Sequence, residues 1–333
     1  MGRIVVISTG GTIASRWQGS GFAADADGSE VVATAPLPEG VTVELVDLFS
    51  VNSPRLTTAH QLTLLRTVHE VLADPDVDGI VVTHGTDTLE ESAFLVDLHH
   101  HDGRPVVFTG SQRPMGTADG DGPGNLYDAL LAASTTRGLG VLVAFAGRVH
   151  AARGTVKTQA VALDAFADPS EELLGKVGFG KVTVLRKPER PRALPLPAMP
   201  ELPPRVDMVM HHADGDPVLL NAAVEAGARG IVLVGTGAGN ATPEIVEAVA
   251  AAVARGVLVA LTTRVAAGPV TEIYTHGGAV DLVAAGAVPT GTLRAGQARI
   301  AVLSALLGSD DAAERTGLLR RALGAAGSVL VGA

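Results

Sequence analysis

Apolar residues follow two alternating patterns along the chain. Short continuous runs rich in valine and isoleucine favour buried strands. In the first part of the chain these runs cover residues 3–8, 79–83, 105–110 and 140–147. Longer segments with apolar residues every three or four positions favour helices, and they cover residues 57–74, 88–101 and 124–137. The alternation is typical of a parallel sheet covered by helices on both faces, and Thr57 or Thr58 is expected to cap the first helix.

The same alternation returns after a proline-rich stretch. Residues 187–205 hold seven of the 19 prolines, and proline at that density removes backbone donors and favours extended chain. Beyond it, strands are predicted over 206–212, 231–237 and 257–263, and helices from Pro217, from Pro243, over 296–307 and over 312–325. We therefore expect two α/β domains with mainly parallel sheets flanked by helices. Their expected bounds are 1–188 and 206–333, with a linker over 189–205.

Composition narrows the possible partners. The 333 residues are 47% apolar, which is enough for a sizeable core. The formal net charge is -10 and there is no dense Lys/Arg tract, which argues against nucleic acid or an acidic membrane surface as a partner. With no cysteine, a thiol nucleophile, a cysteine–zinc site and a disulfide are all excluded. No run approaches the roughly 20 apolar residues of a membrane span, so a cytoplasmic location is expected.

Candidate chemistry lies where the predicted strands end. In an open parallel sheet, ligands bind beyond the carboxyl ends of the strands. Five polar residues of the first domain are expected at this edge: Thr12, Ser53, Thr86, Asp87 and Lys157.

The first of these loops, STGGTIAS at 8–15, contains a glycine pair. Paired glycines can present backbone N–H groups to an anion or to a developing oxyanion. Neither common phosphate-binding glycine motif is present here, and GTGAG at 235–239 matches one only in part. A plain turn between strand and helix remains the alternative.

The stretch HGTDTLEE at 84–91 sets a threonine beside an aspartate. A threonine hydroxyl becomes a nucleophile only when a nearby base takes its proton. A neutral lysine can be that base, so Thr86, Lys157 and Asp87 are candidates for a nucleophile, base and orienting acid. The alternative is a turn and helix cap, with Lys157 in solvent.

Histidine runs invite a metal interpretation. The run at 99–101 is better explained as a solvated helix end, because adjacent helical residues point in different directions. The pair at 211–212 ends a predicted strand and meets the same objection. His84 is expected either to support the neighbouring motif or to pack beneath its loop.

Several motifs together resemble a known family. They are TGGTIA at 9–14, HGTDTLEE at 84–91, FTGSQRP at 108–114, Arg153 with Lys157, GTGAGN at 235–240 and GTLRAGQARIAVLSALL at 291–307. In order and spacing they resemble a bacterial L-asparaginase of the threonine amidohydrolase type, over nearly the whole chain. The resemblance implies a larger and a smaller α/β domain, and hydrolysis of asparagine, or also glutamine, to the acid and ammonia without metal or organic cofactor.

The resemblance also implies roles for individual residues. Thr12 would attack the side-chain amide and form an acyl-enzyme. Thr86, Lys157 and Asp87 would activate a hydroxyl or the hydrolytic water. Asp87 would also hold the substrate ammonium, with Thr86 beside it, and Ser53 would hold the α-carboxylate.

Two positions depart from the family pattern. The loop after TGGTIA usually supplies a tyrosine that contacts the nucleophile, and Phe22 stands at about that place. Phenylalanine can serve as a lid but cannot donate a hydrogen bond. Pro54 follows Ser53 where a polar substrate contact is usual. Three alternatives therefore stay open: a glutaminase, another amidohydrolase of this fold, or a weakly active protein that binds asparagine or aspartate.

The resemblance further implies assembly as a homodimer or homotetramer. In the family, second-domain residues complete the site of a neighbouring subunit. Asn240 matches the family's second-domain asparagine, and Glu272 is the candidate for the acid that reaches the substrate ammonium.

Overall fold

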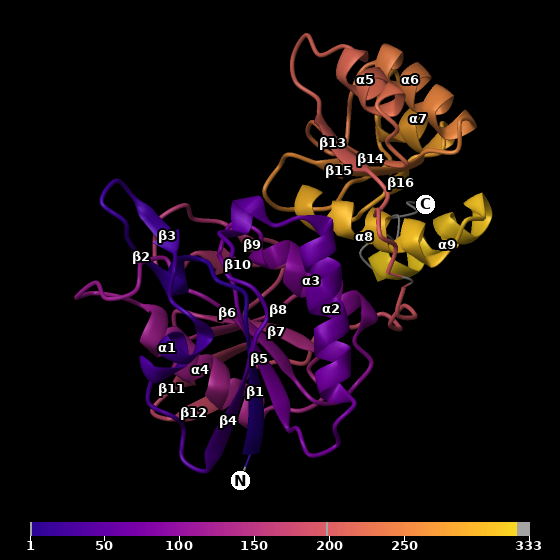
Figure 1. Ribbon diagram of the computed structural model, residues 1–333. Coiled ribbons are helices and arrows are strands. Elements are labelled where there is room, and N and C mark those ends of the chain that lie inside the picture. The colour runs from indigo at the N-terminus through magenta and orange to yellow at the C-terminus, as the bar shows by residue number, and fades with distance from the viewer. Residues whose placement is uncertain (1, 198, 325–333) are drawn as a thin grey trace. The chain divides into compact units, whose positions relative to one another are not determined.

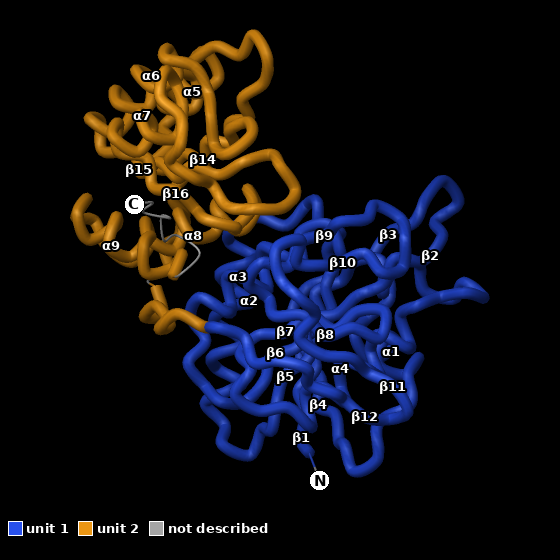
Figure 2. Tube along the Cα trace, turned by 180° about the vertical axis from the view of Figure 1, so that it is seen from behind, with its two compact units in different colours: residues 1–189 blue, residues 190–333 orange. Residues whose placement is uncertain are grey.

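The computed structural model describes residues 2–197 and 199–324. The chain forms two compact units, residues 1–189 and 190–333 (Figure 2). The described residues of the proline-rich stretch 187–205 contain no helix or strand, as proline leads one to expect. The bounds of the linker itself remain a prediction.

The first unit is built on an 8-stranded sheet in the order β12-β11-β8-β7-β6-β5-β1-β4. Its parallel strands are β1 (Gly2–Ser8), β4 (Val41–Asp47), β5 (Gly79–Thr83), β6 (Val106–Thr109) and β7 (Val141–Phe145). An antiparallel extension follows, with β8 (Arg148–Ala151), β11 (Gly175–Gly178) and β12 (Lys181–Val184). Two short ladders complete it, β2 (Ser15–Trp17) with β3 (Phe22–Ala24) and β9 (Val156–Lys157) with β10 (Phe166–Ala167).

Helices cover both faces of this sheet, as the continuous apolar strands predict. Figure 1 shows α1 (Gly28–Ala33) and α4 (Gly122–Thr135) on one side, and α2 (Thr58–Leu72) and α3 (Leu89–His99) on the other. Thr57 caps α2, since its hydroxyl accepts the backbone N–H of His60. The strands β5, β6 and β7 are buried throughout, so apolar packing on both faces fixes their positions.

The second unit repeats this architecture on a smaller scale. Its sheet has the order β13-β14-β15-β16, with β13 (Val206–Met210), β14 (Gly230–Gly235), β15 (Leu258–Thr263) and β16 (Val288–Pro289) all parallel. In Figure 1, α5 (Val218–Glu225), α6 (Pro243–Ala254) and α7 (Ala279–Ala284) lie on one face, and α8 (Ala295–Gly308) and α9 (Ala312–Leu323) on the other. The predicted end of the last helix, at 325, lies outside the described residues.

Some features differ from the sequence expectation. Strand β4 was not predicted because it is an edge strand whose side chains are half-buried or exposed, so it lacks a continuous apolar run. The solvated helix end predicted for the histidine run is wrong for His99 and His100, which are each 1% exposed. The ring of His100 lies against the chain that leads into β6, with Nε2 2.9 Å from the carbonyl oxygen of Arg104.

Candidate active site

The candidate residues of the first unit gather at one edge of its sheet. Ser8 at the end of β1 pairs in register with Thr83 of β5, and Thr83 pairs with Thr109 of β6. The loops that leave these strands therefore start at the same level. The chain runs from β1 to β4 on one side and returns to β5 on the other, which is the reversal of strand order where α/β sheets bind ligands.

Glycines allow these loops to touch backbone to backbone. Gly11 has φ 86°, and a Cβ built on it would lie 2.3 Å from the Cα of Gly85. A Cβ on Gly85 would in turn lie 2.6 Å from the Ser53 hydroxyl oxygen. At each of these two positions, only a residue without a Cβ fits. The close approach brings the segment of Thr12 beside that of Thr86, so the glycine pair is more than a turn signal.

Lys157 joins the residues of the HGTDTLEE stretch. Its Nζ donates to the Thr86 hydroxyl at 2.8 Å and to the Asp87 carboxylate at 2.7 Å. The Lys157 side chain is only 17% exposed, so the alternative of a lysine in solvent is wrong. Thr88, at the N-cap position of α3, makes no side-chain capping bond, so a simple helix cap does not explain the motif either.

Gln112 is a contact that the sequence did not single out. The Thr86 hydroxyl donates to the Gln112 side-chain oxygen at 3.1 Å. The amide nitrogen of Gln112 donates to the carbonyls of Ala160 and Ala162, which fixes its orientation. For Lys157 to accept the proton of Thr86, the amine must be neutral and the hydroxyl must turn away from Gln112. The signal was available, since Gln112 follows a predicted strand inside FTGSQRP.

Ser53 is buried beside the same loop. Its hydroxyl oxygen accepts the backbone N–H of Asp87 at 3.2 Å, and its carbonyl accepts the Thr88 hydroxyl at 3.1 Å. The Ser53 side chain keeps its own O–H to donate. A carboxylate at this edge is therefore a suitable acceptor.

Thr12 and Phe22 belong to the segment that follows β1. Thr12 begins a short 3-10 helix, Thr12–Ala14, and is half-buried. Phe22 lies on β3, is 48% exposed, and meets the ring of Trp17 edge to face at 5.2 Å. The structure thus places Phe22 on an exposed hairpin, packed against Trp17.

Burial shifts the pKa of two groups in the motif. His84 is fully buried and donates from Nδ1 to the carbonyl of Gly85, and burial lowers its pKa to about 4. It therefore packs beneath the loop as a neutral ring. Glu90 accepts the backbone N–H of Lys157 at 2.6 Å, and burial raises its pKa to about 7. The sequence did not single out Glu90.

Asn240 and Glu272 lie in the second unit on neighbouring segments. The backbone of Asn240 closes a turn with Thr236, and its side-chain oxygen is buried without a partner among the described residues. Beside Glu272, the Thr271 N–H donates to the carbonyl of Ala238 at 3.0 Å. The segment of Glu272 therefore packs against the glycine-rich loop that ends at Asn240.

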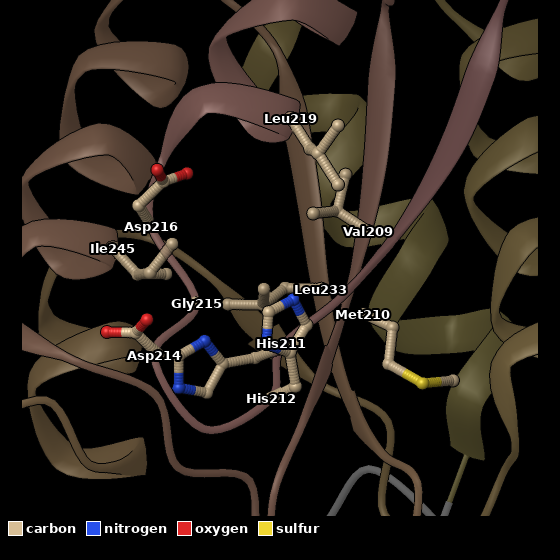
Figure 3. Close-up of a pocket in the computed structure, with 10 residues that line it drawn as sticks. All are labelled: Val209, Met210, His211, His212, Asp214, Gly215, Asp216, Leu219, Leu233 and Ile245. Atoms are coloured by element: carbon tan, nitrogen blue, oxygen red, sulfur yellow. The ribbon is translucent and has the colours of Figure 1, made fainter.

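The second histidine pair lines a separate pocket at the end of β13 (Figure 3). His211 is 8% exposed, and a Cβ on Gly215 would lie 2.8 Å from its Nδ1. His212 turns back to the carbonyl of Ala213 at 2.7 Å. Over residues 2–197 and 199–324, no three His, Asp or Glu side chains are grouped closely enough to hold a metal ion. In the same ranges, no helix is both long and apolar enough to cross a membrane.

Known proteins resemble the chain over most of its length. The family profile described as "Asparaginase, N-terminal" matches residues 3–190, and "Glutaminase/Asparaginase C-terminal domain" matches residues 205–319. The L-asparaginase of Bacillus licheniformis is 37% identical over 86% of this chain and 89% of its own length. The probable L-asparaginase of Deinococcus radiodurans is 37% identical over 90% and 92%. The structure of the probable cytoplasmic L-asparaginase from Campylobacter jejuni superimposes with a TM-score of 0.85 at 27% identity, covering 96% of this chain and 100% of that one.

Proposed function

The chain belongs to the asparaginase family of amidohydrolases, and from this premise we propose that it hydrolyses L-asparagine through a threonine nucleophile and an acyl-enzyme. Family membership and the L-asparaginase relatives support hydrolysis of the asparagine side-chain amide. The assignment of individual residues to steps is our proposal.

In the proposed first step, the Thr12 hydroxyl oxygen attacks the amide carbon and its proton passes to a base. The tetrahedral intermediate collapses, the carbon–nitrogen bond breaks, and the nitrogen leaves as ammonia with that proton. An ester on Thr12 remains. Water then attacks the ester carbon and gives up a proton, which passes to the Thr12 oxygen as its bond to that carbon breaks. Aspartate is released and the Thr12 hydroxyl is restored. Thr86, with Lys157 as base and Asp87 orienting it, activates the attacking hydroxyl or the water.

The observation that carries this proposal is the pair of hydrogen bonds from Lys157 to Thr86 and Asp87. A hydroxyl within 2.8 Å of an amine is in reach for proton transfer. The close approach of Gly11 to Gly85 also supports it, because it brings the backbone of the Thr12 loop against that of the Thr86 loop.

Substrate binding is assigned from the remaining polar groups. The Ser53 O–H would donate to the α-carboxylate of asparagine, and the Asp87 carboxylate, 53% exposed, would hold its ammonium. Asn240 and Glu272 would complete the site of a neighbouring subunit. We therefore propose a homodimer or homotetramer, which light scattering of the purified protein distinguishes from a monomer.

We also propose a cytoplasmic location. The structural neighbour from Campylobacter jejuni is named cytoplasmic, whereas a relative from Haemophilus influenzae, 32% identical over 318 residues, is named periplasmic. Cell fractionation of the native host decides between the two compartments.

Ammonia release from L-asparagine tests the assignment of the threonines. Thr12→Ala and Thr86→Ala should each lower kcat by at least about 10³-fold, because each removes a group that makes or activates a bond. Thr63→Ala is the matched control, since Thr63 is exposed on α2 and its hydroxyl donates to the carbonyl of Ala59 within the same helix. A variant that unfolds at the wild-type temperature yet keeps wild-type turnover removes that threonine from the mechanism.

Phe22 favours a second candidate, a weakly active protein that binds asparagine or aspartate. Its ring cannot donate a hydrogen bond to Thr12, unlike the tyrosine usual at this place. Phe22→Tyr tests this candidate: a large gain in kcat from a nearly inactive wild type supports it. Equal and rapid turnover of both proteins excludes it. Glutamine, assayed in parallel, tests whether Pro54 has changed the amide preference.

A further inference from the structure

The start of α3 holds Lys157 at two separate points. Thr86 and Asp87, just before the helix, accept hydrogen bonds from Nζ at 2.8 and 2.7 Å. Glu90, in the first turn of the helix, accepts the backbone N–H of Lys157 through Oε2 at 2.6 Å. The segment 86–90 therefore fixes both the amino group and the backbone of the same lysine, from 67 to 71 residues away in the chain.

The backbone of Lys157 lies in a short strand. Strand β9 has two residues and, within the part of the chain that the structure describes, pairs with β10, where Phe166 lies opposite Lys157. Phe166 is buried and packs edge to face on Phe145 at 5.1 Å, so that side of the ladder is anchored. The N–H of Lys157 goes to the Glu90 carboxylate, which takes the place of a carbonyl on a neighbouring strand. Without Glu90, the backbone of Lys157 would be fixed by the ladder of β9 with β10 and, one residue further on, by the hydrogen bond from the Thr158 N–H to the Ala165 carbonyl at 2.8 Å.

The carboxyl of Glu90 changes charge near neutral pH. Burial raises the pKa of Glu90 to about 7. The hydrogen bond from the Lys157 N–H acts in the opposite direction and lowers this pKa, but it is the smaller effect. Two charged groups act on it: Glu91 of the same helix raises the pKa, and the Lys157 ammonium lowers it. A carboxylate accepts a stronger hydrogen bond than a neutral carboxyl does. The hold on the Lys157 backbone therefore weakens as the pH falls through about 7.

We propose that Glu90 is a positioning residue, whose carboxylate holds the backbone of Lys157 so that its amino group reaches Thr86. The inference rests on the proposed function, because it concerns the same group of residues. Glu90 acts through Lys157 and not on the substrate. Its loss should therefore lower kcat more than it changes KM.

The pH profile of asparagine hydrolysis between pH 5.5 and 9 tests the proposal with Glu90→Gln. The glutamine oxygen can still accept the Lys157 N–H, but it does not titrate. Wild-type kcat should fall on the acid side with a midpoint near 7. In the variant the part of this fall that is centred near pH 7 should be absent. Its kcat at pH 8 should be about fivefold lower than that of the wild type, because the hydrogen bond is neutral, and its KM should lie within about twofold of the wild-type value. An unchanged fall in kcat near pH 7 in the variant, or a rise in KM as large as the loss of kcat, overturns the proposal.

Asp128→Asn is the matched control. Asp128 is a half-buried carboxyl on α4 whose pKa is also raised by burial, and it accepts the backbone N–H of Gly147. Within the ranges that the structure covers, no hydrogen bond or ion pair joins it to Lys157. Its profile should match that of the wild type. If Asp128→Asn also lost the fall in kcat near pH 7, that fall would not be due to the titration of Glu90, and the proposal would be refuted.

Amide hydrogen exchange of the wild type keeps the test independent of the variant's folding. The protection factor of the Lys157 amide is corrected for the intrinsic exchange rate. It should decrease when the pH is lowered from 8 to 6, whereas the protection factors of the amides in the buried strand β5 should not. Constant protection of Lys157 over this range overturns the role of Glu90. A wild type that folds but fails to hydrolyse asparagine at every pH would instead refute the proposed function, and the exchange result would still decide whether Glu90 holds Lys157.

Discussion

Replacing Lys157 with methionine separates a role in activity from a role in stability. Methionine keeps an unbranched apolar stem but removes the amino group. The variant Lys157→Met therefore deletes the hydrogen bonds of 2.8 Å to Thr86 and 2.7 Å to Asp87 and little else.

The stability change should be small. Two unit charges 2.7 Å apart attract by about 1.5 kcal/mol in a medium as polar as water. The Asp87 side chain is 53% exposed, so solvent screening and side-chain entropy reduce the net contribution to about 1 kcal/mol or less. The methionine stem retains the packing of the lysine stem. The loss of a general base, in contrast, should lower kcat by about 10²- to 10⁴-fold.

The assay pairs urea unfolding with ammonia release from saturating L-asparagine at pH 8. Lys181→Met, at an exposed lysine on β12, is the control and should change neither quantity appreciably. Turnover by Lys157→Met within tenfold of wild type would refute Lys157 as the proton acceptor. A loss of more than about 3 kcal/mol in unfolding free energy would show that Lys157 stabilises the fold far more than a half-exposed ion pair can.

Two further predictions follow from backbone geometry and from burial. Gly11→Ala should abolish activity and lower the melting temperature. Gly11 has a φ of 86°, and the added Cβ would lie 2.3 Å from the Cα of Gly85. An active and equally stable variant would contradict the packing of the two loops. His150 is buried, and burial lowers its pKa to about 4, so the unfolded state binds its proton at a higher pH than the folded state. Relative to His150→Leu, the wild type should therefore lose about 2 kcal/mol of unfolding free energy between pH 7 and pH 5, a difference that urea titrations at both pH values measure. Equal losses in the two proteins would mean that His150 is not held neutral by the fold.

Local sequence determined most of the secondary structure. Apolar runs at 79–83 and 105–110 predicted the buried strands β5 and β6, since a strand covered on both faces needs an apolar side chain at nearly every position. Thr57 was predicted as one of two caps for α2 because a short hydroxyl side chain can satisfy a free N–H at a helix start. Such signals depend on neighbours within a few residues, so they can be found in the chain itself.

Only the tertiary structure decided which distant groups meet. The sequence proposed Thr86, Asp87 and Lys157 as partners, but their hydrogen bonds exist because β9 and the loop after β5 come together across about 70 residues. Gln112 follows a predicted strand, but nothing in the local sequence indicates that Gln112 contacts Thr86 or that Glu90 contacts Lys157. Periodicity records which face of an element is buried, whereas contacts between loops depend on strand order and register, which are set by the packing of the whole sheet.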